Sequence, residues 1–423
     1  MIYNRREFLG LSSTLLATSA TAPAFLRRTA WAAAGNEETS DRVLVVLQLT
    51  GGNDGLNTVV PYTDENYRRL RPKLQLADAK LHKLDDCIGL HPSLDGLKKL
   101  FDNGQAAVVQ SVGYPNPNRS HFESMAIWHT APGDDQLRHG RPNMAAGGWL
   151  ARAIDRGVGK AASTEGAAQA LRVGEGDMPQ ALLGCRVPVP SLMDLAQLKE
   201  RGGALDAKAV QAQVAAWQAG VPAVDNSGNN PLLQFALEGS LAVHATARQI
   251  ERINPTSRDD AKYPNNKLAQ RLRLIAQLIR AGFAAPIYYT ELDGFDTHGS
   301  QLNQHDDLLR QVGGALANFV EDVVKHVPSR PVLALVFSEF GRRLAENASQ
   351  GTDHGTAAPV FLAGGGVVPG VHGPYPDLVN LVDDDPVFAI DFRRVYATVL
   401  ERWLGVASQP ILGGQFEPLK VLK

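Results

Sequence analysis

The sequence predicts an α/β fold with a mostly parallel central sheet, and three observations support this prediction. Four short apolar runs do not alternate with polar residues, as expected of strands covered by helices on both faces. Apolar residues with helical spacing lie between or after these runs. Polar, glycine-containing segments follow the runs, where ligands bind in open α/β sheets. The four runs are Val43–Leu47, Ala106–Val109, Ile287–Tyr289 and Val332–Phe337.

Helical periodicity marks three further segments. One apolar face recurs at i, i+4, i+7 and i+11 in the middle of the chain, and a similar face recurs near its end. A shorter helix is expected just before the second strand, and Gly405 is expected to end the last helix. The apolar positions are Leu268, Leu272, Ile275 and Ile279; Phe392, Val395, Tyr396, Val399, Leu400 and Trp403; and Leu94, Leu97 and Leu100.

The first 34 residues have the order of a signal peptide. Arg5 and Arg6 precede an apolar stretch from Leu9 to Phe25, and Ala-x-Ala sites follow at 30–34. Because paired arginines specify the twin-arginine (Tat) route, we expect residues 1–34 to be a Tat signal, the Tat translocase to be a partner during export, and the mature protein to be periplasmic or secreted. The alternatives are an ordinary N-terminal helix and an uncleaved anchor, for which the stretch is short against the ~20 residues of a membrane span.

Composition narrows the remaining possibilities. The net charge of −2 over 423 residues gives no basic surplus for nucleic acid, and no second apolar stretch predicts a membrane span in the mature chain. Residues 35–423 are expected to form one α/β domain, with a helical and loop insertion over about 200–265. Cys87 and Cys185 could pair, although two separate buried thiols are the favoured interpretation.

The segments that follow the predicted strands carry the residues of a metal centre. Asp54 follows the first strand, Asp296 and His298 follow the third, Glu339 follows the fourth, and His354 precedes another apolar run. A divalent metal is held by Asp, Glu and His side chains and polarises a phosphoryl or similar oxygen. We therefore expect these five side chains to hold a divalent metal, whose identity the sequence does not specify.

Ser120 and His121 open a predicted helix that runs through Trp128. Backbone N–H groups at a helix N-terminus favour an anion, and a serine hydroxyl activated by a metal can attack an ester. Ser120 is therefore the candidate nucleophile, and His121 is its neighbour in catalysis. Structural alternatives stay open at this point, because Ser120 suits a helix N-cap and Asp54 suits an Asx-turn.

These segments resemble the bacterial family of domains of unknown function 1501, within the alkaline phosphatase and sulfatase-like superfamily. The resemblance covers nearly all of the chain after residue 34 and implies a three-layer α/β sandwich. It is carried by LTGGNDGLNTVVPY from Leu49, YPNPNRSHFESMAIW from Tyr114, LDGFDTHGSQ from Leu292, FSEFGRR from Phe337, GTDHGTAAPVFLAGG from Gly351 and DFRRVYATVL from Asp391.

Superfamily architecture implies an order of functional parts along the chain. These are an acidic ligand, a nucleophile at a helix start, an Asp/His group, a strand-end acid with a histidine, and a final histidine. The matching residues are Asp54, Ser120, Asp296 with His298, Glu339 and His354. Phe340 stands where the histidine after the acid is usual, which argues against a full two-metal site. Ser120 matches only the phosphatase-like register, because the sulfatase register places Pro115 at the nucleophile position.

Two functions from different classes follow from these features. The leading hypothesis is metal-assisted hydrolysis of a phosphate, sulfate or related ester, carried by a small molecule or a polymer. The rival is a non-catalytic envelope protein that binds a ligand and keeps the fold with a degenerate site. Phe340 favours the rival, as does Ala126, which replaces an acid common in the family. The clustered strand-end motifs favour the enzyme, and the fold alone does not decide between them.

The export hypothesis predicts a defined mutant phenotype. Replacing Arg5 and Arg6 together by lysine should trap the precursor in the cytoplasm, because the route reads the arginine pair as an address. Cell fractionation followed by immunoblotting measures the distribution. An unchanged periplasmic yield in the double variant would remove the hypothesis.

Overall fold

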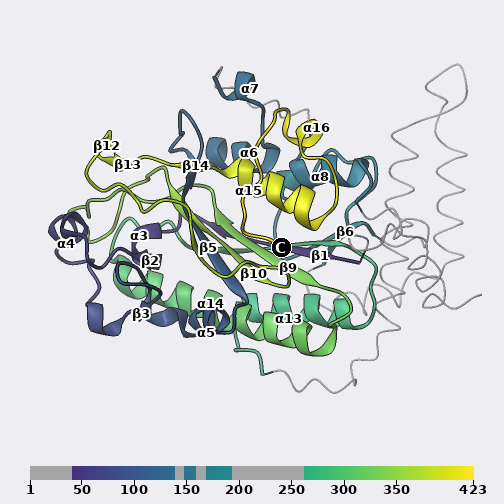
Figure 1. Cartoon of the computed structure of the whole chain (residues 1–423), viewed down its shortest axis with the longest axis horizontal. Helices are drawn as coiled ribbons and strands as arrows, with labels where there is room; N and C mark the ends of the chain where they lie inside the picture. Colours follow the sequence, from purple (N-terminus) through teal and green to yellow (C-terminus); the bar gives the residue numbers. More distant parts are fainter. Residues whose placement is uncertain (1–40, 139–146, 159–167, 193–261) are drawn as a thin grey trace, which may run out of the picture. The chain divides into compact units, whose positions relative to one another are not determined.

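The computed structural model describes residues 41–138, 147–158, 168–192 and 262–423. Within residues 42–423 a central sheet lies between two layers of helices (Figure 1). The predicted signal peptide at 1–34 and most of the insertion predicted over 200–265 lie outside the described residues. The α/β prediction with a central sheet is confirmed.

The sheet is mostly parallel, and all four predicted strands belong to it. Strand β1 pairs in parallel with β8 and β9, whereas β10 runs antiparallel to both β9 and β5. The strand order is β11-β5-β10-β9-β1-β8-β6-β7, and β14 pairs with β5. The bounds are β1 (Val43–Thr50), β5 (Ala106–Gly113), β6 (Ala170–Val173), β7 (Ser191–Leu192), β8 (Ile287–Asp293), β9 (Val332–Ser338), β10 (Ala358–Gly364), β11 (Gly370–His372) and β14 (Ile390–Asp391).

Helices cover both faces of the sheet (Figure 1). One layer contains α5 (Asp95–Asp102), α13 (Lys267–Arg280) and α14 (Gln301–His326). The other contains α6 (His121–Thr130), α8 (Trp149–Asp155), α15 (Phe392–Thr398) and α16 (Gln409–Leu412). The three predicted helices are confirmed as α5, α13 and α15, the last of which continues into a π-helical turn at Val399–Trp403. Gly405 has a φ of 69°, the left-handed conformation expected just after a helix.

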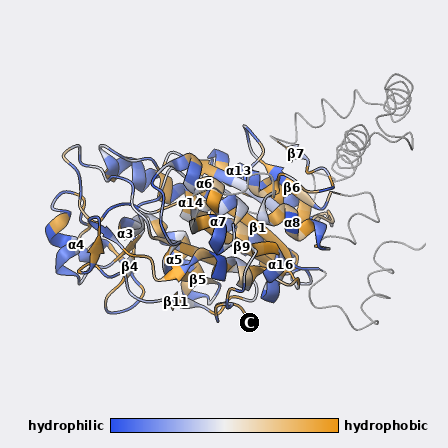
Figure 2. Ribbon diagram, turned by 90° about the horizontal axis from the view of Figure 1, so that it is seen from above, coloured by the Kyte–Doolittle hydropathy of each residue, from blue (hydrophilic) through white to orange (hydrophobic). Residues whose placement is uncertain are grey.

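The two helix layers explain why the strand sequences do not alternate. In β1, Val43, Val45 and Leu47 belong to the core cluster that contains α13 and α14. Leu44 and Val46 belong to the opposite cluster, with α8 and α15. Because successive side chains point to opposite faces, a strand covered on both faces must be apolar at every position. Hydrophobic colouring accordingly concentrates on the sheet and the helices around it (Figure 2).

Smaller elements extend from the central sandwich. They are α3 (Gly55–Thr58), α4 (Glu65–Leu70), α7 (Asp134–Arg138), a small sheet of β2 (Val59–Val60), β3 (His82–Lys83) and β4 (Gly89–Leu90), and a hairpin of β12 (Leu381–Val382) and β13 (Asp385–Pro386). Cys87 and Cys185 are both free thiols. Cys185 is buried but Cys87 is exposed, so the prediction of burial is wrong for Cys87.

Within the described ranges, none of the helices has the length and apolar character that crossing a membrane requires.

Strand direction gathers the strand-end motifs at one edge. Parallel strands β1, β8 and β9 all end there. Strand β10 runs the opposite way, so it begins at this edge, and His354 lies shortly before its first residue. The segments that follow β1, β8 and β9 and the segment that precedes β10 therefore meet in space, as predicted for the first three.

Candidate metal centre

Three histidines and one aspartate converge at this edge, and we call His121, Asp296, His298 and His354 the His/Asp centre. The Nε2 atoms of His298, His354 and His121 lie 3.0, 3.1 and 3.5 Å from Asp296 Oδ1. One ligand atom from each of His121, Asp296 and His354 lies within 4.8 Å of the others. His298 lies beside this three-residue group, with its Nε2 2.8 Å from that of His354.

The opposite ring nitrogen of each histidine contacts a separate oxygen acceptor. His121 Nδ1 lies 2.9 Å from the Glu339 carboxylate, and His354 Nδ1 lies 2.7 Å from the backbone carbonyl of Arg119. His298 Nδ1 lies 3.4 Å from the carboxylate of Asp353. In a neutral imidazole these contacts place the proton on Nδ1 and leave a lone pair on Nε2. Such outer contacts orient histidines that bind metals.

The Nε2 atoms fit a divalent cation. Two lone pairs at 2.8 Å, on His298 and His354, repel each other unless a proton or cation lies between them. His121 Nε2 is buried and has no hydrogen-bond partner among the described residues. Zinc binds nitrogen and oxygen at ~2.0–2.2 Å in tetrahedral sites, which places ligand atoms roughly 3.3 Å apart. The contacts to Asp296 at 3.0–3.5 Å and the contact between His298 and His354 at 2.8 Å lie close to that spacing.

The pKa values of the residues in the His/Asp centre are shifted in different directions. The hydrogen bond with Glu339 raises the pKa of His121. Burial lowers the pKa of His354, although Asp296 acts in the opposite direction. Burial would raise the pKa of Asp296, but the Arg342 and His354 hydrogen bonds outweigh it and lower the value to about 2. Asp296 is therefore an anion near neutral pH, as a metal ligand must be.

Arg342 ties the surrounding loops together. Its buried guanidinium donates to the carbonyls of Gly51, Gly52, Phe295 and Thr352 and to Asp296 Oδ1, at distances of 2.5–3.0 Å. These acceptors come from the segments after β1 and β8 and from the segment before β10. A single side chain thus fixes three of the segments that form the edge.

The two loops that carry His298 and His354 are also bonded directly to each other. The backbone N–H of Ser300 donates to Ser349 O at 3.0 Å, and that of Gln301 donates to Gln350 O at 2.9 Å. Gly351 lies against His298 so closely that a β-carbon there would stand 2.2 Å from a backbone atom. Glycine at 351 is therefore required for the close approach of these loops.

Asp54, which was expected to be a metal ligand, pairs with an arginine and not with a member of the His/Asp centre. Its buried carboxylate lies 2.6 Å from Arg71 Nη1 and accepts hydrogen bonds from the Asn57 backbone and the Gln301 side chain. Burial opposes ionisation of Asp54, but Arg71 outweighs it and lowers the pKa. Arg71 is itself fully buried and donates to backbone carbonyls of Arg343 and Leu344. Arg71 thus supplies the positive charge that Asp54 faces.

Ser120 occupies the N-cap position of α6, the element whose first residue is His121. Its side chain makes no capping hydrogen bond in the described structure, and the residue is exposed. The structure therefore places this hydroxyl at a helix N-terminus, beside the centre in sequence, and leaves it available. Glu339 is fully buried and contacts His121 and the backbone N–H of Gly51 rather than solvent.

Phe340 forms an apolar wall of the centre. Its ring centroid lies 4.9 Å from that of His121 and 4.7 Å from that of His354. A phenylalanine provides no ligand, so this position orients two imidazoles by packing. Gly52 makes room for the ring, because a β-carbon at Gly52 would stand 2.2 Å from a Phe340 ring atom.

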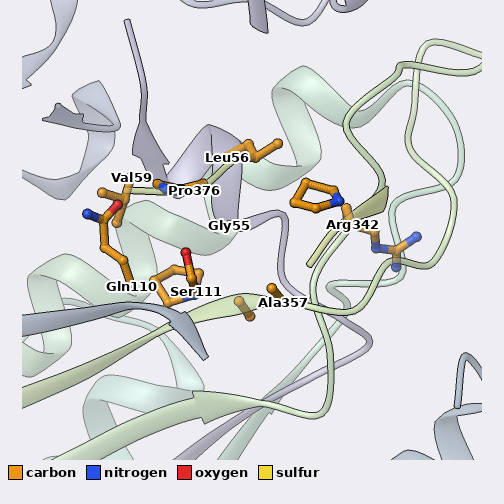
Figure 3. Close-up of a pocket in the computed structure, with 11 residues that line it drawn as sticks. Gly55, Leu56, Val59, Gln110, Ser111, Arg342, Ala357 and Pro376 are labelled. Carbon is orange, nitrogen blue, oxygen red and sulfur yellow. The ribbon is translucent and has the colours of Figure 1, made fainter. Parts of the chain in front are cut away.

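A small cavity lies beside Arg342 (Figure 3). Its volume of about 20 Å³ holds roughly one water molecule, and no member of the His/Asp centre lines it. It is therefore too small for a substrate. The centre itself opens to solvent, since the side chains of Asp296 and His298 are 48% and 45% exposed.

Several residues of the site were not predicted as such. His121 was expected beside the nucleophile, whereas the structure places it in the centre itself. Arg119 and Arg342 hold centre residues, although no role was assigned to them, and Asp353, which forms an Asp/His pair with His354 in the sequence, holds His298. Their only signal in the sequence is their position inside the NRSH, FGRR and TDHG segments.

Residues 41–406 match the family described as "Protein of unknown function (DUF1501)". The chain belongs to this family. The match spans the β1, β8 and β9 strand ends and the whole His/Asp centre of this family member. No match is found among curated proteins.

Solved structures similar to this family member share little sequence with it. A protein in the alkaline phosphatase superfamily from Vibrio parahaemolyticus is 9% identical, with a TM-score of 0.40 over 89% of this chain and 70% of its own. The C-terminal periplasmic domain of EcEptC from Escherichia coli, in complex with Zn, is 10% identical, with a TM-score of 0.33 over 76% and 72%. The lipoteichoic acid synthase LtaP from Listeria monocytogenes is 8% identical, with a TM-score of 0.33 over 84% and 76%.

Removing Arg342 should destabilise the protein strongly. In Arg342→Met several buried carbonyls lose their donor, and the free energy of unfolding should fall by about 3–5 kcal/mol. Denaturant unfolding monitored by circular dichroism measures the change. Arg69→Met, at an exposed arginine of α4, is the matched control and should change stability by no more than about 0.5 kcal/mol. Equal stabilities of the two variants would contradict the role of Arg342.

Proposed function

We propose that this protein is a metal-dependent hydrolase of phosphate, sulfate or related esters. The observation that carries the proposal is the convergence of three histidine Nε2 atoms on Asp296 while each Nδ1 contacts an oxygen. His121, His298, His354 and Asp296 would hold the ion. A bound divalent ion would supply Lewis acidity, which polarises the ester. Imidazole and carboxylate donors suit zinc and several other transition metals.

The proposed ligand set differs from the set expected from the sequence. Asp296, His298 and His354 stay in it, and His121 joins it. Glu339 would act through His121 Nδ1, where a carboxylate makes the imidazole a better donor. Asp54 would remain the partner of Arg71, so one guanidinium replaces a second cation. We therefore propose one ion per chain.

Ser120 is the proposed nucleophile. Its hydroxyl lies at the N-terminus of α6, where backbone N–H groups stabilise negative charge that develops on the attacked group. Attack by the Ser120 oxygen on phosphorus or sulfur would expel the alcohol and leave the acid esterified to Ser120, and water would then release it. The exposed side of the centre lets an ester approach from solvent.

A second candidate is a metal-binding protein without catalytic activity. It is favoured by the absence, among the described residues, of any hydrogen bond between the Ser120 hydroxyl and a base. It is also favoured by Phe340, which occupies the position of a usual ligand and packs on two imidazoles. Both candidate functions require a bound metal, but only the hydrolase requires Ser120 as a nucleophile.

Metal binding has a direct test. The EDTA-treated protein should bind one zinc ion per chain, measured by equilibrium dialysis with elemental analysis. His298→Ala should remove a ligand and abolish tight binding, and Glu339→Gln should lower the affinity about 10–100-fold. Binding should also weaken as the pH falls, because protons compete for the imidazole nitrogens.

Two control variants sharpen the metal test. His372→Ala removes a histidine of β11 whose Nε2 contacts the backbone carbonyl of Val368, and it should bind zinc like the wild type. Asp54→Asn should keep a stoichiometry of one. No zinc binding by the wild type would contradict the proposal, and two ions that fall to one in Asp54→Asn would contradict the single-ion site.

Ser120→Ala decides between enzyme and binding protein. If Ser120 is the nucleophile, the variant should lose hydrolysis of p-nitrophenyl phosphate or sulfate while zinc binding and stability stay unchanged. Mass spectrometry of acid-quenched wild type should also find the phosphoryl or sulfuryl group on Ser120. A loss of ~0.5–2 kcal/mol of stability with activity retained would instead identify an N-cap. Ser349→Ala, at an exposed serine of the neighbouring loop, is the control.

A further inference from the structure

A second polar cluster adjoins the His/Asp centre, formed by Arg119, Arg343 and Asp385. Arg119 precedes Ser120, and its backbone carbonyl accepts the hydrogen bond from His354. Arg343 follows Arg342, and its backbone N–H donates to Asp353 O at 3.0 Å. The backbone of each arginine therefore contacts a segment that forms the His/Asp centre: Arg119 contacts His354, and Arg343 contacts Asp353.

A tight hairpin presents Asp385 to these arginines. The turn residues Asp383 and Asp384 have φ values of 51° and 61°, the left-handed pair typical of two-residue hairpins. The Thr356 hydroxyl donates to Pro386 O at 2.8 Å and fixes the hairpin to the segment before β10. The position of Asp385 is thus determined by the same edge of the sheet.

Each residue of this cluster has a buried polar atom without a hydrogen-bond partner among the described residues. Arg119 Nη2 lies 3.2 Å from Asp385 Oδ2. Asp385 Oδ1, Arg119 Nε and Arg343 Nε are all buried and, across the described ranges, none has a hydrogen-bond partner. Buried polar groups in native proteins are almost always paired, so unpaired atoms on all three residues indicate a missing ligand or bound water.

Charge and donor geometry identify that ligand. The Arg119 guanidinium pairs with Asp385, and Arg343 adds a second positive charge that acts on it; burial raises the pKa of Asp385 to about 6 even though both arginines act to lower it. Arg343 also lowers the pKa of Asp353, so its charge is shared between two carboxylates, and the feature that the cluster offers a ligand is its unpaired guanidinium N–H donors. Guanidinium groups recognise oxyanions through paired hydrogen bonds. An anion would satisfy both arginines, whereas a cation would meet two like charges.

We propose that Arg119 and Arg343 form a subsite for a second phosphate or sulfate group on the molecule whose ester is held at the His/Asp centre. This inference rests on the proposed function and narrows the substrate class to esters that carry another oxyanion. Asp385 positions Arg119 and competes with the ligand for it.

The test uses inorganic sulfate and the full-length protein after EDTA treatment, with binding measured by calorimetry. Sulfate should bind one per chain without metal. Arg343→Ala and Arg119→Gln should each weaken binding at least about tenfold, as expected for lost hydrogen bonds to a charged group. Asp385→Asn should strengthen it, because the competing charge is removed. Arg156→Ala, at an exposed arginine of the C-terminal end of α8 whose guanidinium contacts Pro410 O, is the matched control and should bind like the wild type.

The His298→Ala variant separates this inference from the proposed function. Sulfate binding retained in His298→Ala supports an arginine subsite distinct from the centre, even if no zinc binds to the wild type. Sulfate binding lost in His298→Ala would overturn the inference, because the anion would then sit at the centre. Absence of sulfate binding by the wild type, or an unchanged affinity in folded Arg343→Ala, would overturn it as well.

Discussion

The site depends on one buried guanidinium. Arg342 donates to four backbone carbonyls and to Asp296, and these acceptors belong to three segments that are far apart in the sequence. A buried cation is costly unless nearly all its donors are paired. The loops must therefore adopt the conformation that surrounds Arg342, and this conformation directs Asp296 towards the three histidines. The loops are held in this arrangement because together they provide the hydrogen-bond acceptors for the buried guanidinium of Arg342.

Strand direction determines which segments lie at this edge of the sheet. Because β10 is antiparallel to its neighbours, the segment before it joins the segments that follow β8 and β9. His354 thereby meets Asp296, although the two residues come from opposite ends of their respective strands. A parallel β10 would place His354 at the other edge of the sheet, a full strand length away.

The two arginine-linked carboxylates show how the same residue type acquires different roles. Asp54 is fully buried and paired with Arg71, so its charge is already neutralised inside the protein. Asp296 also contacts an arginine, but its side chain is half exposed and faces three imidazoles. Only the second arrangement leaves a carboxylate where an external cation can approach. Solvent access, rather than residue type, separates the structural pair from the carboxylate that a cation can reach.

Both the architecture and the edge of the sheet where the site lies could be predicted from the amino-acid pattern. Apolar runs without alternation require helices on both faces, and parallel strands place the residues that follow them together, so Asp296, His298 and Glu339 could be assigned to one edge. The side-chain partners of the site residues depend instead on how the layers pack. Asp54 pairs with Arg71, Glu339 contacts His121, and Arg342 is buried among backbone carbonyls. These pairings could not be predicted because they join residues up to 291 positions apart. Local spacing fixes which end of a strand a residue follows, but side-chain direction and burial, which select its partner, arise only when the layers pack.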